Sequence, residues 1–172
     1  GGMIDHLGYP YCRGRVFETI EEDLGQYDDE TEIFWATGCA LFIRRADFWK
    51  MKGFDERFFA HQEEIDLCWR LKNAGRKIYY CGKSTVFHVG GGTLNKQSPQ
   101  KTFLNFRNNL TMLLKNLPTS SLFWIIPLRL VLDGIAGIYF GMKDGFPHLI
   151  AVLKAHFGFY GMFAESLKLR SK

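Results

Sequence analysis

The chain has 172 residues, of which 47% are hydrophobic, 23% charged and 16% aromatic. This length accommodates one domain, or one domain with an appendage. The apolar fraction is high enough to form a buried core, which excludes a disordered tail. The four cysteines include no Cys-x-x-Cys pair, and a chain of this size does not depend on disulfides, so we expect a reducing, cytoplasmic compartment.

Charge is distributed unevenly along the chain. Residues 1–95 carry 12 Lys and Arg against 15 Asp and Glu, whereas residues 96–172 carry 10 against 3. Such a division is typical of two parts with different surroundings. The second part is both basic and apolar, which favours an anionic surface. Because no arginine-rich cluster, RNA-binding signature or zinc-finger spacing occurs, we expect a membrane surface and no nucleic acid. An ordinary solvated basic face is the alternative.

The first part of the chain predicts an irregular segment followed by one strand and one helix. Residues 1–32 are rich in Gly, Tyr and acidic groups, which is typical of a surface loop with at most one helical turn. The apolar run at 33–43 predicts a strand. Residues 54–75 predict a loop that enters a helix, and Gly75 fits the C-terminal cap of that helix.

Further along, the pattern changes from short β-prone runs to helices. The runs at 77–82 and 84–89 predict strands, and a glycine-rich polar linker follows them. Three helices are predicted after the linker, at residues 100–117, about 121–142 and about 146–168. We therefore expect two domains, 1–95 and 96–172.

The middle helix of the tail is long and apolar but contains charges. Arg129 and Asp133 are four residues apart, so they share one face and are placed to form an ion pair. Because charged groups are costly at the centre of a bilayer, a helix lying in the membrane interface fits the sequence better than a spanning one. The protein would then be peripheral at the inner face of the membrane. A buried helical hairpin is the alternative.

The densest cluster of ionisable side chains lies at residues 61–66. On a helical wheel Glu63, Asp66 and Arg70 share a polar face, whereas Glu64 lies among apolar residues. An apolar wall disfavours the charged form of a carboxylate, and a raised pKa suits a general base. The position in the first helical turn opposes this effect, because the helix dipole favours the anion. A solvated helix face without a chemical role is the alternative.

His88 is a second candidate. It lies near the end of the 84–89 run, just before three consecutive glycines. A histidine at the end of a strand, next to a flexible segment, is a common location for a ligand or a catalytic group. The glycine run is not a phosphate-binding loop, because no Lys-Ser/Thr follows it. A structural histidine is the alternative.

Several motifs occur in the order and at the spacing of a known enzyme family. They are the stretches 38–45 (GCALFIRR), 53–59 (GFDERFF) and 63–71 (EEIDLCWRL), followed by Gly75 and His88. Together they resemble the second half of family 2 glycosyltransferases, in the rhamnosyltransferase-like branch of inverting enzymes with a GT-A fold. The resemblance covers about residues 33–95, and the helix that contains residues 107–109 is similar to an extension that such proteins often carry.

The resemblance implies an α/β fold, namely the C-terminal, acceptor-side portion of a GT-A nucleotide-diphospho-sugar transferase followed by a helical extension. In that family a Glu-Asp pair opens the helix, and its second carboxylate is the catalytic base. Here that position is Glu64, which is one methylene longer than Asp. Glu63 would bind the acceptor sugar or support the site. His88 would be a ligand of a divalent metal, Mg²⁺ or Mn²⁺, on the donor diphosphate.

The resemblance also implies roles for residues around the base. Asp66 and Arg70 would support the neighbouring loop through an ion pair. Trp35, Thr37 and Gly38 are similar to the stretch that lines the acceptor pocket. The implied partners are a nucleotide-sugar donor and a glycan or lipid-linked acceptor in cell-surface polysaccharide or glycan biosynthesis.

The family's nucleotide-binding half precedes the region of resemblance and contains an Asp-x-Asp metal motif. No Asp-x-Asp occurs in this sequence. We therefore expect a fragment of a longer enzyme that transfers no sugar alone and that binds its metal only together with the missing half.

Two other functions remain open. The basic, Phe-rich tail fits a non-catalytic module that anchors at a membrane surface or forms homo-oligomers. A metal-dependent hydrolase that uses Glu64 and His88 is the weaker alternative, because no HxH or HExxH motif occurs.

Overall fold

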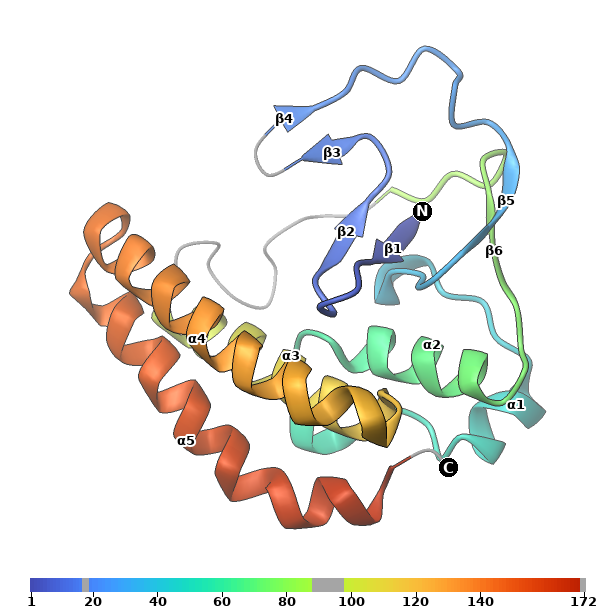
Figure 1. Ribbon diagram of the computed structural model, residues 1–172. Helices are drawn as coiled ribbons and strands as arrows, with labels where there is room; N and C mark the ends of the chain where they lie inside the picture. The colour runs from blue at the N-terminus through green and yellow to red at the C-terminus, as the bar shows by residue number, and fades with distance from the viewer. Residues whose placement is uncertain (17–18, 88–97, 171–172) are drawn as a thin grey trace. The chain divides into compact units, whose positions relative to one another are not determined.

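The computed structural model describes residues 1–16, 19–87 and 98–170. They belong to two compact units (Figure 1). The first unit comprises Gly1–Glu56 and Glu63–His88 and contains the strands; the helical unit comprises Arg57–Gln62 and Val89–Lys172. The fold is thus mixed α and β. The short segment 57–62 belongs with the tail helices, whereas the sequence predicted a single division near residue 95.

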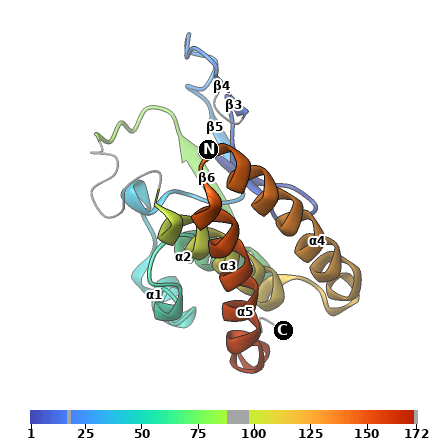
Figure 2. The ribbon, with the colours of Figure 1, turned by 90° about the vertical axis from the view of Figure 1, so that its left-hand side faces the viewer.

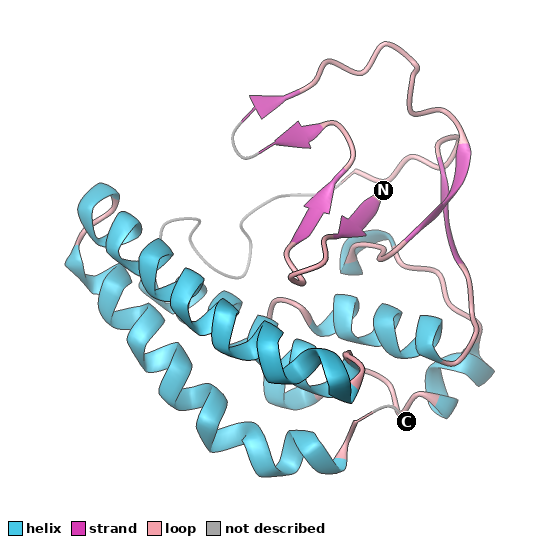
Figure 3. Ribbon diagram, viewed as in Figure 1, coloured by secondary structure: helices cyan, strands magenta, loops and turns pink. Residues whose placement is uncertain are grey.

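The described strands of the first unit form three two-stranded antiparallel pairs (Figure 3). β1 (Gly2–Ile4) pairs with β2 (Pro10–Cys12), β3 (Arg15–Val16) with β4 (Thr19–Ile20), and β5 (Glu30–Ile33) with β6 (Ile78–Cys81). In the β5–β6 pair, Glu32 is opposite Tyr79 and Ile33 is opposite Ile78. This pairing joins segments that are far apart in the sequence and so closes the unit.

The prediction of an irregular segment at residues 1–32 is wrong, because β1 to β5 occupy much of it. The Asp5 carboxylate accepts hydrogen bonds from the backbone N–H groups of Leu7 at 2.9 Å and Tyr9 at 2.8 Å, and Gly8 has a φ of 81°. These features form the turn between β1 and β2. The polar, glycine-rich composition therefore reflects turns between very short strands, which are too short to show an alternating pattern.

Two other strand predictions are also wrong. The predicted strand at 33–43 is displaced, because β5 ends at Ile33 and the chain continues through a 3₁₀ turn, η1 (Gly38–Ala40), and a short helix, α1 (Arg45–Lys50). The described part of the 84–89 run, residues 84–87, contains no strand, and residues 88 and 89 lie outside the described residues. The run at 77–82 is confirmed as β6.

Helix α2 (Glu63–Asn73) follows a second 3₁₀ turn, η2 (Glu56–Phe58), and ends as the sequence predicts. Gly75 has a φ of 77°, a conformation that favours glycine after a helix C-terminus. On the inner side of α2, Leu67 and Cys68 are fully buried. The ring of Trp69 meets Phe34 edge to face, with 5.2 Å between the ring centroids, and this contact anchors α2 to the segment that follows β5.

The three tail helices are confirmed near their predicted bounds as α3 (Pro99–Asn116), α4 (Thr119–Lys143) and α5 (Phe146–Lys168). Ser98 caps α3, since its hydroxyl accepts a hydrogen bond from the Gln100 backbone N–H at 3.2 Å. Gly145, with a φ of 108°, forms the turn between α4 and α5. Helix α5 packs along both α3 and α4, and α4 and α5 run side by side (Figures 1 and 2).

Small residues allow α4 and α5 to approach closely. A Cβ on Gly137 would lie 3.2 Å from Cβ of Val152, and a Cβ on Gly141 would lie 3.1 Å from Cβ of Leu149. This Gly-x-x-x-Gly spacing places both glycines on the side of α4 that faces α5. The hairpin is therefore built on close backbone contact, and its apolar core includes Leu110, Leu114 and Phe159, packed against Leu122, Ile126 and Leu130.

Helix α4 has an unusual distribution of charge. Arg129 and Asp133 form the ion pair that their spacing predicts, with 3.3 Å between nitrogen and oxygen, and both side chains are buried. Within the described residues, α4 is the one helix with the length and the apolar composition to cross a membrane. Only 22% of its most apolar stretch is buried. The charged groups thus face inward while apolar side chains face outward.

Candidate functional site

The candidate base Glu64 lies in the first turn of α2 and is half-buried. A Cβ on Gly38 would lie 4.0 Å from the Glu64 Cβ, so the backbone of η1 passes close to it. Burial raises the pKa of Glu64 above its ordinary value, and the carboxylate of Glu63 raises it further. Backbone N–H groups, including those of Gly38 and Ile65, hydrogen-bond the carboxylate and lower this pKa, but the net direction is upward.

One oxygen of the Glu64 carboxylate is buried without a hydrogen-bond partner. Oε2 of Glu64 is shielded from solvent and has no hydrogen-bond partner, and the same holds for Oε2 of the adjacent Glu63. A buried polar atom without a partner calls for an explanation, such as a bound ligand, a water molecule or a catalytic role. A carboxylate with a raised pKa and a free oxygen has the properties of a general base that receives its proton from a bound substrate.

The acceptor-lining residues expected from the resemblance lie between β5 and α1. The Trp35 indole N–H donates to the Met3 carbonyl at 2.8 Å, which fixes the ring against β1. Trp35 and Thr37 line a pocket of about 870 Å³ within the first unit. Gly38 lies instead beside Glu64. One short segment therefore supplies part of a pocket wall and a contact to the candidate base, although Glu64 itself is not among the residues that line this pocket.

All four cysteines also line this pocket. Cys68, on α2, is fully buried, and burial raises the pKa of its thiol to about 11. The thiol is therefore protonated at neutral pH and has little nucleophilic character. Cys68 contributes packing to the pocket and is not a candidate nucleophile.

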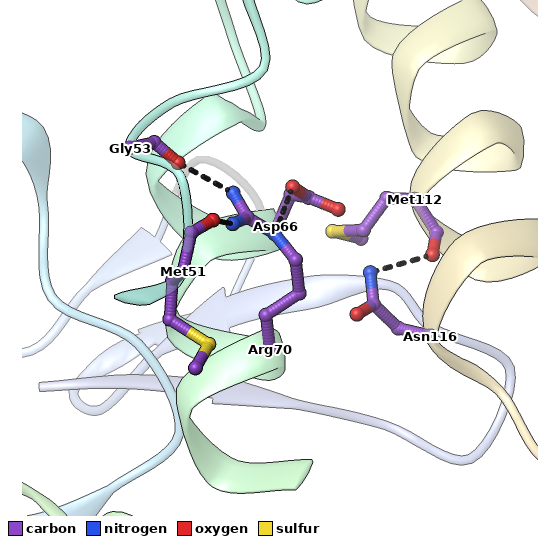
Figure 4. A network of polar contacts seen from close by, with 6 residues as sticks. All are labelled: Met51, Gly53, Asp66, Arg70, Met112 and Asn116. Carbon is purple, nitrogen blue, oxygen red and sulfur yellow. Dashed lines mark hydrogen bonds and ion pairs between the residues drawn. The ribbon is translucent and has the colours of Figure 1, made fainter. Parts of the chain in front are cut away.

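Asp66 and Arg70 support the site from the next turn of α2. Asp66 is fully buried, so the alternative of a solvated helix face does not hold at this residue. Arg70 Nε donates to Asp66 Oδ2 at 2.8 Å (Figure 4). The terminal nitrogens of Arg70 donate to the backbone carbonyls of Met51 and Gly53, the latter at 2.8 Å. The ion pair thus fastens the segment after α1 to the helix that carries Glu64.

The segment directly before α2 has a strained backbone. Phe59, His61 and Gln62 have positive φ angles of 63°, 68° and 73°. Residues other than glycine rarely adopt this region, at a cost of about 1–2 kcal/mol each. Such conformations persist only where the surrounding contacts impose them. Because α2 begins at the next residue, this backbone sets the start of the helix that carries both candidate carboxylates.

Two α3 residues hold this segment within the helical unit. The Asn108 side-chain amide donates to the carbonyls of Phe58 at 2.9 Å, Ala60 at 2.9 Å and His61 at 2.8 Å. Arg107 adds bonds to the carbonyls of Arg57 at 3.0 Å and Phe58 at 3.2 Å. No role was predicted for these two side chains from the sequence. The feature of the sequence that could have indicated such a role is a run of three polar residues, 107–109, in a largely apolar part of the helix.

Replacing Asn108 by Ala is expected to lower the free energy of unfolding by about 2–4 kcal/mol. The change removes hydrogen bonds worth about 1 kcal/mol each and leaves buried carbonyl oxygens without a donor. Urea denaturation measures the effect. Asn105→Ala on the same helix is the matched control, with an expected change within about 0.5 kcal/mol. Equal stability of Asn108→Ala and wild type would show that the amide does not hold the segment.

The predicted metal ligand His88 lies outside the described residues. Among the residues that the structure does describe, no group of three or more His, Cys, Asp or Glu side chains could hold a metal ion. These residues therefore do not form a complete divalent-metal site.

Comparison with known proteins places these features in context. The chain is 28% identical over 134 residues, which are 78% of its length, to an N-acetylglucosaminyl-diphospho-decaprenol L-rhamnosyltransferase of Mycobacterium tuberculosis. This relative occurs in strains CDC 1551 / Oshkosh and ATCC 25618 / H37Rv. Rhamnosyltransferase WbbL of Escherichia coli K12 is 39% identical over 59 residues, which cover 34% of this chain and 22% of that protein. The chain is therefore similar in sequence to rhamnosyltransferases.

The homology confirms the resemblance to glycosyltransferases that the motifs indicated. No family model and no solved structure matches the chain. The chain spans about two fifths (42%) of the length of the M. tuberculosis relatives.

Proposed function

We propose that this chain is the acceptor-side portion of an inverting GT-A glycosyltransferase, which moves a sugar from a nucleotide-activated donor to a hydroxyl group. The main observation that supports the proposal is the environment of Glu64. This residue is a half-buried carboxylate with a raised pKa and an oxygen without a partner. It also lies at the position of the catalytic base in family 2 glycosyltransferases, which this chain resembles.

The proposed reaction is a single displacement. Glu64 Oε2 accepts the proton of the acceptor hydroxyl. The hydroxyl oxygen forms a bond to the anomeric carbon from the side opposite the nucleotide. The bond between that carbon and the diphosphate oxygen breaks, and its electron pair leaves with the nucleoside diphosphate. The sugar configuration is therefore inverted. The raised pKa of Glu64 brings the proton affinity of the base closer to neutral pH, where a general base is most effective.

The surrounding residues have supporting roles in this proposal. Glu63, whose Oε2 has no partner, would accept a hydrogen bond from the acceptor sugar. Trp35 and Thr37 would form part of the wall against which the acceptor lies. The Arg70 guanidinium, bound to Asp66, would keep the neighbouring loop in place.

A divalent cation, Mg²⁺ or Mn²⁺, belongs to the proposal only together with a nucleotide-binding half. A metal there would neutralise charge on the departing diphosphate. His88 is the residue of this chain that we propose as a contributor to that site. The described residues supply no complete metal site, so the roles derived above are those of protein side chains alone.

The names of the relatives support a substrate class. The M. tuberculosis relatives are named for rhamnosyl transfer and for an N-acetylglucosaminyl-diphospho-decaprenol, and the E. coli relative is named a rhamnosyltransferase. We therefore propose nucleotide-activated rhamnose as the donor and a glycan or lipid-linked glycan as the acceptor, in the biosynthesis of a cell-surface polysaccharide.

A chimera tests the proposal. The matched residues of this chain replace the matching segment of an M. tuberculosis relative, and transfer of radiolabelled rhamnose to a lipid-linked N-acetylglucosaminyl diphosphate is measured. We expect transfer by the chimera and none by the 172-residue chain alone. A folded chimera that binds the donor but transfers nothing would contradict the proposed function. Donor-dependent nucleotide release by the chain alone would contradict the need for a separate donor half.

A further inference from the structure

The outward side of α4 carries a continuous apolar stripe. Its members, which we call the α4 face, are Trp124, Leu128, Val131, Ile135, Ile138 and Met142. They recur every three or four residues, so they share one side of the helix. Each is 39–77% exposed. A stripe of this length is unlike the scattered apolar residues of an ordinary soluble surface and indicates an interaction site.

The charges of α4 point away from this face. Arg129 and Asp133 are buried and pair with each other on the opposite side of the helix. From Thr119 to Met142 α4 contains no other charged residue. A helix in water normally has the reverse arrangement, with charged residues outside and apolar residues inside. The inverted pattern fits a helix whose outer side contacts hydrocarbon.

Part of the positive charge of the tail is engaged in internal contacts. The Lys115 ammonium lies 5.0 Å from the ring centroid of Phe58, and Arg107 bonds to backbone carbonyls. Arg170 donates to the Leu117 carbonyl at 2.7 Å. Together with Arg129, four of the ten basic residues after residue 95 are therefore engaged in internal contacts. These contacts reduce the attraction to an anionic surface that net charge alone predicts, and the apolar face is a separate feature that does not depend on charge.

The packing of the hairpin argues against a membrane-spanning arrangement. Helix α5 packs along α3 as well as along α4. Helix α3 contains Arg107, Asn108 and Lys115, and the Lys154 side chain of α5 is exposed. Moving α4 and α5 across a bilayer would bring α3 with them or expose its polar residues, and it would place Lys154 within the hydrocarbon at a cost of about 2.5–3.5 kcal/mol at the centre.

We propose that the α4 face docks on a lipid bilayer, with α4 lying in the plane of the interface and not crossing it. Leu128, Val131 and Ile135 enter the acyl region, and Trp124 lies at the headgroup level, where its amphipathic ring is favoured. The buried ion pair remains on the side away from the lipid. This inference extends beyond the proposed transferase activity and does not depend on it.

Vesicle flotation of the full 172-residue chain tests the inference. We expect the chain to float with vesicles of phosphatidylcholine alone, and to remain bound at about 1 M NaCl, where the Debye length falls to about 3 Å. The double variant Val131→Glu/Ile135→Glu is expected to lower the partition coefficient at least about tenfold, because two carboxylates would have to enter the interface. Circular dichroism verifies that the variant retains its helices.

The matched control places the same charges on exposed apolar residues of the first unit. Val16 and Ile20 are 69% and 70% exposed, so Val16→Glu/Ile20→Glu changes the total charge equally. This control is expected to float like the wild type. Failure of the wild type to float, or equal loss in both double variants, would overturn the inference.

Three further results would overturn it in specific ways. Binding that requires anionic lipid and is lost in high salt would assign the interaction to the lysines and not to the α4 face. Resistance of the vesicle-bound chain to extraction by alkaline carbonate would indicate a spanning helix. A soluble dimer that Val131→Glu/Ile135→Glu dissociates, without vesicle binding, would assign the face to a second copy of the chain.

Discussion

Replacing Glu64 by Gln is expected to lower kcat for sugar transfer about 10²–10⁴-fold in the chimera, because an amide cannot accept the proton of the acceptor hydroxyl. Glu64→Asp retains the carboxylate and matches the residue found in the resembling family, so most of the activity should remain. The KM of the acceptor should change little in Glu64→Gln, because the side chain keeps its shape. Steady-state kinetics with varied acceptor separates kcat from KM.

Glu63→Gln is the matched control for this series, since it is the same substitution one residue earlier on the same helix. We expect it to raise the KM of the acceptor more than it lowers kcat. If Glu63→Gln abolished kcat and Glu64→Gln left it intact, the roles of the two carboxylates would be reversed. If neither variant changed kcat, the base would lie outside α2.

The pH dependence of transfer follows from the same carboxylate. Burial and the Glu63 carboxylate raise the pKa of Glu64, so the acidic limb of kcat/KM should lie above the ordinary Glu value. Glu63→Gln removes one of the two causes and should move that limb toward lower pH. An acidic limb that does not move would show that Glu63 does not influence the base.

The raised pKa of Glu64 also affects stability. The folded state binds this proton more tightly than the unfolded state, so the free energy of unfolding decreases as pH rises from the ordinary Glu value, 4.5, through the folded pKa. Glu64→Gln should therefore be more stable than wild type at pH values above this window and similar to it below. Thermal unfolding at the two ends of the window measures the difference.

The sequence predicted the helices better than the strands, for a physical reason. Helices α3, α4 and α5 are 18 to 25 residues long, so their apolar period repeats several times and their ends carry Pro and Gly signals. The strands are two to four residues long, and a stretch of that length cannot show alternation. Their pairing is set by turns and by partners distant in sequence, such as β5 with β6.

The candidate site was predictable where it depends on one helix. The period of α2 separates Glu64 from the polar residues, and the half-buried carboxylate agrees with that separation. The helical wheel placed Asp66 on the polar face of α2, because it cannot show that this side of the helix is buried in the fold. The contacts of Asn108 with residues 58–61 join segments about fifty residues apart, and no local pattern encodes such a contact.

Arg70→Met is expected to lower the free energy of unfolding of the first unit by about 3–5 kcal/mol. The substitution leaves the buried Asp66 carboxylate without the guanidinium that it contacts at 2.8 Å, and breaking a buried ion pair from one side has a cost of this size. The carbonyls of Met51 and Gly53 lose a donor as well. Urea denaturation, followed by the near-ultraviolet signal of the tryptophans, measures the loss.

Two controls distinguish the effect of breaking a buried ion pair from the effect of removing any positive charge. Arg76→Met removes a guanidinium that is 50% exposed and pairs with Asp47 at 2.8 Å, and its effect should stay within about 1 kcal/mol. The double variant Asp66→Leu/Arg70→Met removes both charges and should recover part of the stability lost in Arg70→Met, since an apolar pair avoids the uncompensated carboxylate. The recovery should be incomplete, because the two loop carbonyls still lack their donor. Equal costs for Arg70→Met and Arg76→Met would show that the Asp66–Arg70 pair does not hold the loop to α2.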